Sequence, residues 1–145
     1  MTARRRWIWV WGPTILWAAF LFVMSSIPGS SIPTFPSYFQ LLPGVAIDKQ
    51  IHASVYAVLG MLFWRSLRMS RGIPPLRAAA LAAVCATLYG ITDEIHQIFT
   101  PLRSSDWRDA LADAIGGTIG AFLLAAISLW WEAGRGARPG VGPGR

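Results

Sequence analysis

Charge and cysteine are both scarce in this sequence. Only 14% of its 145 residues are charged and 54% are hydrophobic, whereas about a quarter of a typical soluble domain is charged. No charged residue occurs between Trp7 and Ile47. The one cysteine, Cys85, lies within an apolar run, which excludes an intramolecular disulfide and a thiolate metal cluster. This composition argues against a water-soluble globular protein.

The positive charge of the chain is unevenly distributed. Thirteen Lys and Arg residues against 7 Asp and Glu residues give a formal charge of +6. The basic residues form short clusters between apolar runs, without a continuous basic face or interleaved stacking aromatics. We therefore expect no nucleic-acid partner, and we predict an integral membrane protein.

Four apolar runs approach the ~20 residues that cross a bilayer core. They cover residues 7–24, 45–64, 76–92 and 110–131. No clear small-residue cleavage site follows the first run, so we interpret it as an uncleaved anchor. We predict an all-α protein with four transmembrane helices in one domain, residues 1–131. Residues 132–145, rich in Gly, Pro and Arg, are predicted to form a disordered basic cytoplasmic tail.

The basic residues also predict the orientation, because Lys and Arg that flank membrane spans are retained on the cytoplasmic side. A cytoplasmic N-terminus leaves only Lys49, Arg103 and Arg108 outside. Both termini are then cytoplasmic. The first outer loop, residues 25–44, is too rich in proline for a regular helix, and we predict a connector or a lid. Its apolar residues would rest at the lipid headgroups: Tyr38, Phe39 and Leu41.

In this topology most acidic residues and both histidines gather on the outer side. They are Asp48, Asp93, Glu94, Asp106, Asp109, Asp113, His52 and His96. The uncharged run of residues 78–92 spans only about 22 Å as a helix, against about 30 Å of hydrocarbon. The outer helix ends must therefore enter the membrane. Because an ionised side chain facing lipid costs about 2.5 to more than 10 kcal/mol, these groups should turn inward and pair. We predict a polar pocket in the outer half of the bundle.

Helical spacing places these polar residues in stripes. Asp48, His52 and Tyr56 recur every four residues, and Asp93 with Gln97 and Asp109 with Asp113 do the same on later helices. The spacing of Gly116 and Gly120 lets another helix approach closely.

The stripes suggest roles in catalysis or binding. Asp48 and His52 fit an acid–base pair in which the carboxylate orients the imidazole, or a structural hydrogen bond that ties this helix to its neighbours. We expect Arg103 and Lys49 to compensate the carboxylates, because buried charges require partners. Arg103 is also suited to gripping a phosphate. We assign as candidate catalytic residues His52, Glu94, Asp48 and Asp93. We assign as candidate substrate-binding residues Arg103, Lys49, Gln97, Tyr56, Asp109 and Asp113.

Other roles remain open for several of these groups. For Asp106 and Asp109 a structural role also fits: Ser105 or Asp106 can cap the fourth helix, and the helix dipole stabilises acids in its first turn. Asp109 and Asp113 are like charges one turn apart, so one of them should have a raised pKa unless a cation intervenes. The sequence has no His-x-x-x-His or Cys-x-x-Cys pair, so we expect no metal and no other cofactor.

Three ordered motifs then resemble a known family. They are Asp48-Lys49-x-x-His52-x-x-x-Tyr56, Tyr89-Gly90-x-x-Asp93-Glu94-x-x-Gln97-x-Phe99-x-Pro101-x-Arg103, and Asp109-x-x-x-Asp113-x-x-Gly116-x-x-x-Gly120. Over about residues 15–130 the chain resembles the VanZ-like family of small bacterial membrane proteins. One departure is Asp113, where the family often has Asn. The resemblance implies a multi-pass protein of the bacterial cytoplasmic membrane. The family's namesake is linked to reduced susceptibility to the glycopeptide teicoplanin, without an established reaction.

Our leading hypothesis is a cell-envelope protein whose outer-leaflet pocket recognises or modifies a lipid-linked or cell-wall-precursor headgroup. Arg103 and Lys49 would hold anionic oxygens, and His52 and Glu94 would handle protons. One alternative is a proton- or lipid-translocating carrier that uses Asp93 and Asp113 as relays. Another is a non-catalytic scaffold. Membrane lipids or lipid-linked precursors are the expected partners, and the sequence does not decide whether the protein is an enzyme.

Overall fold

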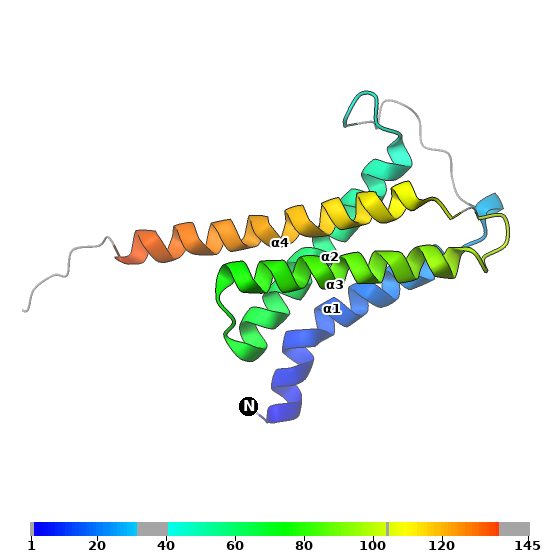
Figure 1. Cartoon of the computed structure of the whole chain (residues 1–145). Helices are drawn as coiled ribbons and strands as arrows, with labels where there is room; N and C mark the ends of the chain where they lie inside the picture. Colours follow the sequence, from blue (N-terminus) through cyan, green and yellow to red (C-terminus); the bar gives the residue numbers. More distant parts are fainter. Residues whose placement is uncertain (1, 32–40, 104, 137–145) are drawn as a thin grey trace, which may run out of the picture.

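The computed structural model describes residues 2–31, 41–103 and 105–136. Within these ranges it contains four α-helices, one short 3-10 helix and no strand (Figure 1). The helices are α1 (Ala3–Ser25), η1 (Gly29–Ser31), α2 (Ile47–Arg71), α3 (Pro75–Gln97) and α4 (Trp107–Gly136). The predicted all-α class is confirmed. Each of the four predicted apolar runs lies mostly within its own α-helix. Tyr38, Phe39 and residues 137–145 lie outside the described residues.

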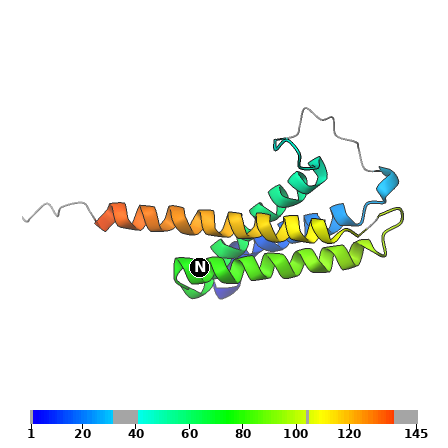
Figure 2. The ribbon, with the colours of Figure 1, turned by 45° about the horizontal axis from the view of Figure 1, so that its top comes forward.

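Helix α4 is the centre of the packing. It contacts α2 and α3 along much of its length, whereas α1 packs mainly on α2. In both ribbon views α3 and α4 run side by side, and α2 crosses them at an angle (Figures 1 and 2). Small fully buried residues fill the contact between α3 and α4: Ala79, Ala82, Ala121 and Ala125. Because these side chains are short, the two helix backbones can lie close together.

The glycines of α4 bring it against the backbone of α2. A Cβ atom on Gly116 would collide with the carbonyl group of Ala53, and one on Gly120 would collide with that of Ala57. The close approach predicted from their spacing is confirmed. This contact also fixes the register between the helices, so that polar residues one turn from Gly116 face the start of α2.

Helix α1 is joined to α2 by polar contacts near Pro13. A proline has no N–H to donate to the carbonyl four residues earlier, which is that of Trp9. The guanidinium of Arg65 donates to this carbonyl oxygen at 3.3 Å. The next residue of each helix adds a second contact: the hydroxyls of Thr14 and Ser66 are buried and lie 2.8 Å apart. These contacts satisfy polar groups that would otherwise face an apolar interior.

Three of the helices are long and apolar enough to cross a membrane: α1, α3 and α4. Helix α2 has 25 residues, but it carries charged residues near both ends. Large apolar side chains cover the outside of the bundle; Leu16 is 72% exposed, for example. Such a surface is suited to lipid contact. The fold is therefore that of a helical membrane protein with at least three candidate spans.

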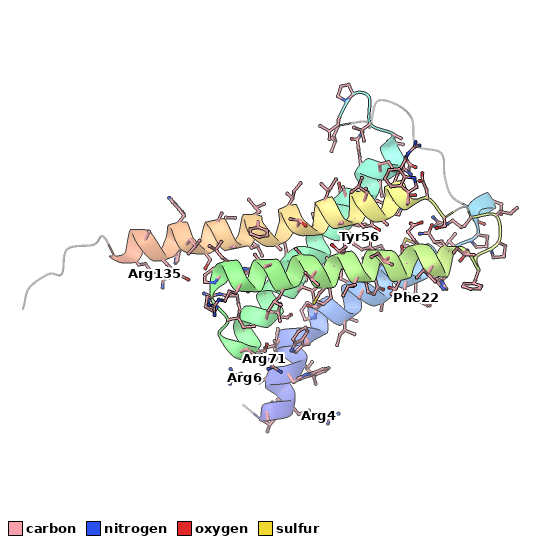
Figure 3. The ribbon with its side chains drawn as sticks, viewed as in Figure 1. Arg4, Arg6, Phe22, Tyr56, Arg71 and Arg135 are labelled. Atoms are coloured by element: carbon pink, nitrogen blue, oxygen red, sulfur yellow. The ribbon has the colours of Figure 1, made fainter. Side chains whose placement is uncertain are left out.

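Side-chain contacts show which helix ends lie together. At one end Arg68 of α2 pairs with Glu132 of α4 at 3.0 Å, and Figure 3 places Arg4, Arg6 and Arg71 toward the same end. At the other end the backbone N–H of Gly29 donates to the carbonyl of Pro101, between η1 and the loop after α3. Consecutive α-helices therefore alternate in direction.

The C-terminal end of the last helix requires one correction. We predicted that residues 132–145 are disordered, but α4 continues to Gly136. Glu132 is held by Arg68 and by the hydroxyl of Ser128, both at 3.0 Å. These contacts support one more helical turn than composition indicated.

Candidate functional site

An open cavity of about 900 Å³ lies between the second half of α1, the first half of α2, the end of α3 and the loop that follows it. Much of its wall is apolar: Phe20, Leu21, Met24, Ile27, Ile47, Ile51, Val55 and Leu102. The polar lining residues are Ser25, Ser31, Asp48, His52, Tyr56, Asp93, Gln97, Arg103 and Asp109. The cavity therefore offers apolar surface beside a group of charged and hydrogen-bonding side chains.

The cavity collects most of the residues predicted to form the site. The α2 stripe of Asp48, His52 and Tyr56 lines it, as does the α3 pair of Asp93 and Gln97. The amide Nε2 of Gln97 donates to Oδ2 of Asp93 at 3.1 Å. Three predicted site residues are outside the lining and lie behind or beside it: Lys49, Glu94 and Asp113.

His52 pairs with a carboxylate on another helix. Its Nδ1 lies 2.9 Å from Oδ1 of Asp113, which is completely buried on α4. The interpretation of Asp48 and His52 as a pair is therefore wrong, whereas the alternative, a hydrogen bond that ties this helix to a neighbour, agrees with the contact of His52. Asp48 lies 3.2 Å from the ammonium of Lys49, and its side chain is 58% exposed. The close contact of α4 with α2 at Gly116 offers His52 the more buried partner.

Space for Asp113 depends on a glycine in α3. A Cβ atom at Gly90 would lie 2.8 Å from Cβ of Asp113 and 3.3 Å from the ring of Tyr56. Tyr56 is 1% exposed, and Figure 3 places it in the middle of the bundle. Among the described residues, neither its hydroxyl nor Oδ2 of Asp113 has a hydrogen-bond partner. Unpartnered buried polar atoms are rare in stable proteins.

Glu94 completes this buried group. Its Oε2 accepts from the backbone N–H of Asp106 at 2.9 Å and from the hydroxyl of Ser105 at 3.1 Å. Its Oε1 is buried and has no partner within the described part of the chain. Ligating atoms of His52, Glu94 and Asp113 all lie within 4.8 Å of one another. Within the described ranges, these three residues form a group that could hold a metal ion.

Lys49 is surrounded by carboxylates. Its ammonium lies 3.2 Å from Asp48, 3.0 Å from Asp106 and 2.5 Å from Asp109, and its side chain is only 18% exposed. The sequence predicted that a basic residue compensates these acids, and for Lys49 this is confirmed. Three carboxylates occupy its donors, so Lys49 ties α2 to the start of α4.

Asp106 caps the last helix. Its Oδ1 accepts from the backbone N–H of Arg108 at 2.9 Å, as the capping alternative predicted. This N–H bond, and after it the bond from Lys49, lowers the pKa of Asp106 below its ordinary value of 3.8. The site thus begins where a helix N-terminus and an ammonium both favour negative charge.

Arg103 lines the opposite side of the cavity. Its Nε donates to the carbonyl of Ile27 at 3.2 Å and its Nη2 to that of Met24 at 3.0 Å. Among the residues that the structure describes, no salt bridge joins Arg103 to a carboxylate. The expectation that Arg103 compensates the acids is therefore not met. It binds carbonyls where α1 ends, which are the natural partners of a cation at a helix C-terminus.

Two further outcomes concern residues outside the expected set. His96 lies apart from the buried group. Its Nε2 is 3.0 Å from the hydroxyl oxygen of Ser26, and its ring packs on that of Phe22 with 4.5 Å between the ring centroids. Sequence reasoning did not assign Ser25, which lines the cavity, because an isolated serine at a helix end gave no signal of a role there. It considered Ser105 only as a possible helix cap, but the hydroxyl of Ser105 binds Glu94.

The sequence model of the VanZ/LLP1 family matches residues 10–128. The chain belongs to this family. No curated protein and no solved structure matches it.

Every residue that lines the cavity of this VanZ/LLP1 protein lies inside the matched range. The three apolar helices agree with a membrane location. The resemblance stated from the three motifs is confirmed, and the chain is a VanZ/LLP1 membrane protein.

Proposed function

We propose that this VanZ/LLP1 protein spans the bacterial cytoplasmic membrane four times, with both termini in the cytoplasm. We further propose that its cavity, in the outer half of the bundle, recognises or modifies a lipid-linked or cell-wall-precursor headgroup. The observation that carries this proposal is the combination of apolar wall and polar lining in one open cavity. Such a combination suits an amphiphile, whose chain needs apolar contact and whose headgroup needs hydrogen bonds.

The orientation rests on the charge at the two ends of the bundle. Arg68 and Glu132 mark the end with most basic residues, which the positive-inside rule assigns to the cytoplasm. The Lys49 cluster marks the opposite end, and the cavity lies beside it. Helix α2 is the fourth span in this proposal. Its charged residues lie near its ends, within reach of water, and its middle is covered by α4.

Arg103 is the group best suited to an anionic headgroup. It lines the cavity, and its hydrogen bonds to the carbonyls of Ile27 and Met24 use two of the five N–H donors of a guanidinium. The remaining donors can grip a phosphate or carboxylate. We therefore assign the anion to Arg103 alone and give Lys49 a structural role, which narrows the sequence-based proposal.

His52 and Asp113 form the pair best suited to moving a proton. The carboxylate orients the imidazole, as in many general acid–base pairs, and His52 lines the cavity. Asp93 and Gln97 can accept from and donate to hydroxyl or amide groups of a headgroup. A reaction at this headgroup would use His52, with Glu94 behind it.

Single replacements test the proposal. The chain is expressed in a teicoplanin-sensitive bacterium as wild type, His52→Ala, Glu94→Ala and Arg103→Ala, and glycopeptide susceptibility and membrane protein level are measured together. We expect wild type to reduce susceptibility and the three variants to lose the effect at normal protein level. His96→Ala and Arg108→Ala are matched controls because neither residue lines the cavity or belongs to the group of His52, Glu94 and Asp113. If all three variants fold, insert and still reduce glycopeptide susceptibility as much as wild type does, the proposal is overturned.

A further inference from the structure

Three helices each contribute one metal-ligating side chain to the same buried point. His52 comes from α2, Glu94 from α3 and Asp113 from α4, and their ligating atoms lie within 4.8 Å of one another. Glu94 is 6% exposed and Asp113 is not exposed at all. No two of these residues are neighbours in the sequence, so a search for metal-binding motifs cannot find them.

The unsatisfied atoms of this group call for an additional partner. Oε1 of Glu94, Oδ2 of Asp113 and the hydroxyl of Tyr56 are all buried without a hydrogen-bond partner among the described residues. Tyr56 and Oδ2 of Asp113 border the same space, since both lie within 3.3 Å of a Cβ placed on Gly90. Two carboxylates that share a buried site repel each other unless a cation or a proton intervenes. The imidazole of His52 reaches only one of them in a hydrogen bond.

We propose that His52, Glu94 and Asp113 bind one divalent transition-metal ion of the Zn²⁺ or Mn²⁺ type. An imidazole nitrogen with two carboxylate oxygens suits Zn²⁺ and Mn²⁺, whereas Mg²⁺ and Ca²⁺ prefer all-oxygen sites. Metal–ligand bonds of about 2.0–2.2 Å place tetrahedral ligand atoms about 3.3 Å apart. The 2.9 Å separation of His52 and Asp113 must therefore widen slightly for both to bind one ion.

Three protein ligands leave a coordination position for water or substrate, as in catalytic zinc sites. His52 lines the cavity while Glu94 and Asp113 lie behind it, so the ion would sit at the cavity wall. The bonds from Ser105 and the backbone N–H of Asp106 to Glu94 hold its other oxygen and would orient it as a ligand. With the ion bound, His52 and Asp113 would be ligands instead of the proton-moving pair proposed above, and water in the open coordination position would take over that role. The proposal is tested independently of the headgroup, because its test measures bound metal.

The experiment begins with wild-type protein purified in detergent through a tag without histidines. The protein is stripped with EDTA, dialysed and titrated with Zn²⁺ and separately with Mn²⁺, and bound metal is measured by plasma mass spectrometry. We expect saturation at about one ion per chain for at least one of the two metals, and a rise in melting temperature with metal concentration. Failure of wild type to bind either metal at 100 µM, on the order of the weakest useful affinity, overturns the proposal.

Conservative variants locate the ion. His52→Gln, Glu94→Gln and Asp113→Asn should each weaken binding at least about 10-fold. The matched controls should bind as wild type: His96→Gln and Glu132→Gln. If all three site variants bind metal as wild type does, the metal lies elsewhere and the assignment is contradicted. The same holds if the controls lose binding to the same extent as the site variants. If a site variant does not fold, Co²⁺ added to stripped wild type decides the matter. A visible spectrum typical of low-symmetry nitrogen and oxygen ligation supports the site, and that of hexaaqua Co²⁺ overturns it.

Discussion

The carboxylate of Asp113 on α4 hydrogen-bonds the imidazole of His52 on α2, with 2.9 Å between Oδ1 and Nδ1. The contact crosses an interface in which Gly116 meets the backbone of Ala53, one residue before His52. A larger residue at position 116 would hold the helices apart and separate the pair. The small residues of α4 and the polar site are therefore parts of one arrangement, in which close backbone packing creates the buried acid–histidine contact.

The energetic weight of this pair can be measured by changing Asp113. Asp113→Leu should lower the free energy of unfolding by about 3–5 kcal/mol, because it leaves the partly buried imidazole of His52 without its partner. Asp113→Asn can still accept from His52 and should cost less, about 1.5–3 kcal/mol. Unfolding in mixed detergent with EDTA present measures both values. Equal, small losses for the two variants would show that the contact contributes little.

The helix interface is tested by two glycines on α4. Gly120→Ala places a methyl group against the carbonyl of Ala57. Through overpacking it should lower the free energy of unfolding by about 1–3 kcal/mol. Gly134→Ala is the matched control, since nothing lies within 4 Å of a Cβ there. It should be neutral or slightly stabilising because alanine is the better helix former. A neutral Gly120→Ala would contradict the packing described here.

Acid sensitivity is expected from Asp106. Because folding lowers its pKa from the ordinary value of 3.8, its contribution to stability is complete at higher pH. That contribution is lost as pH falls through 3.8 toward the lowered pKa. Unfolding of wild type and Asp106→Asn is compared between about pH 6 and pH 3. The stability difference should shrink toward acid pH, and a constant difference would contradict the assigned charge on Asp106.

Membrane orientation is tested by cysteine labelling. In a Cys85→Ser background, single cysteines are placed at Leu41, between α1 and α2, and at Gly134, near the end of α4. Leu41 is 81% exposed. A membrane-impermeant maleimide added to intact cells, with the outer membrane permeabilised where there is one, should label Leu41→Cys only. Lysed cells should show labelling of both. Labelling of Gly134→Cys alone in the intact cells would reverse the orientation.

The amino-acid sequence was sufficient for the helices and for much of the α2 stripe. Apolar runs and the spacing of Gly116 and Gly120 report local properties, namely which face is buried and where a helix can approach. The same periodicity placed Asp48, His52 and Tyr56 on one face, and all three line the cavity.

Pairing between helices was beyond the reach of that reasoning. Periodicity favoured Asp48 as the partner of His52, but the register of α2 against α4 presents Asp113, and Asp48 is held by Lys49. Register depends on the sum of many backbone contacts, which no single motif encodes. The capture of the Trp9 carbonyl by Arg65 was missed for the same reason, although Pro13 signals an unpaired carbonyl.

Native mass spectrometry of the gently purified protein tests the central claim, that the cavity holds an anionic amphiphile. Wild type should retain a phosphate-bearing lipid at about one per chain, since the cavity of about 900 Å³ is the size of a typical ligand site. Arg103→Gln should lose that lipid, while Arg108→Gln should keep it. A wild-type protein that carries no specific lipid, or an Arg103→Gln variant that retains it fully, would contradict the account.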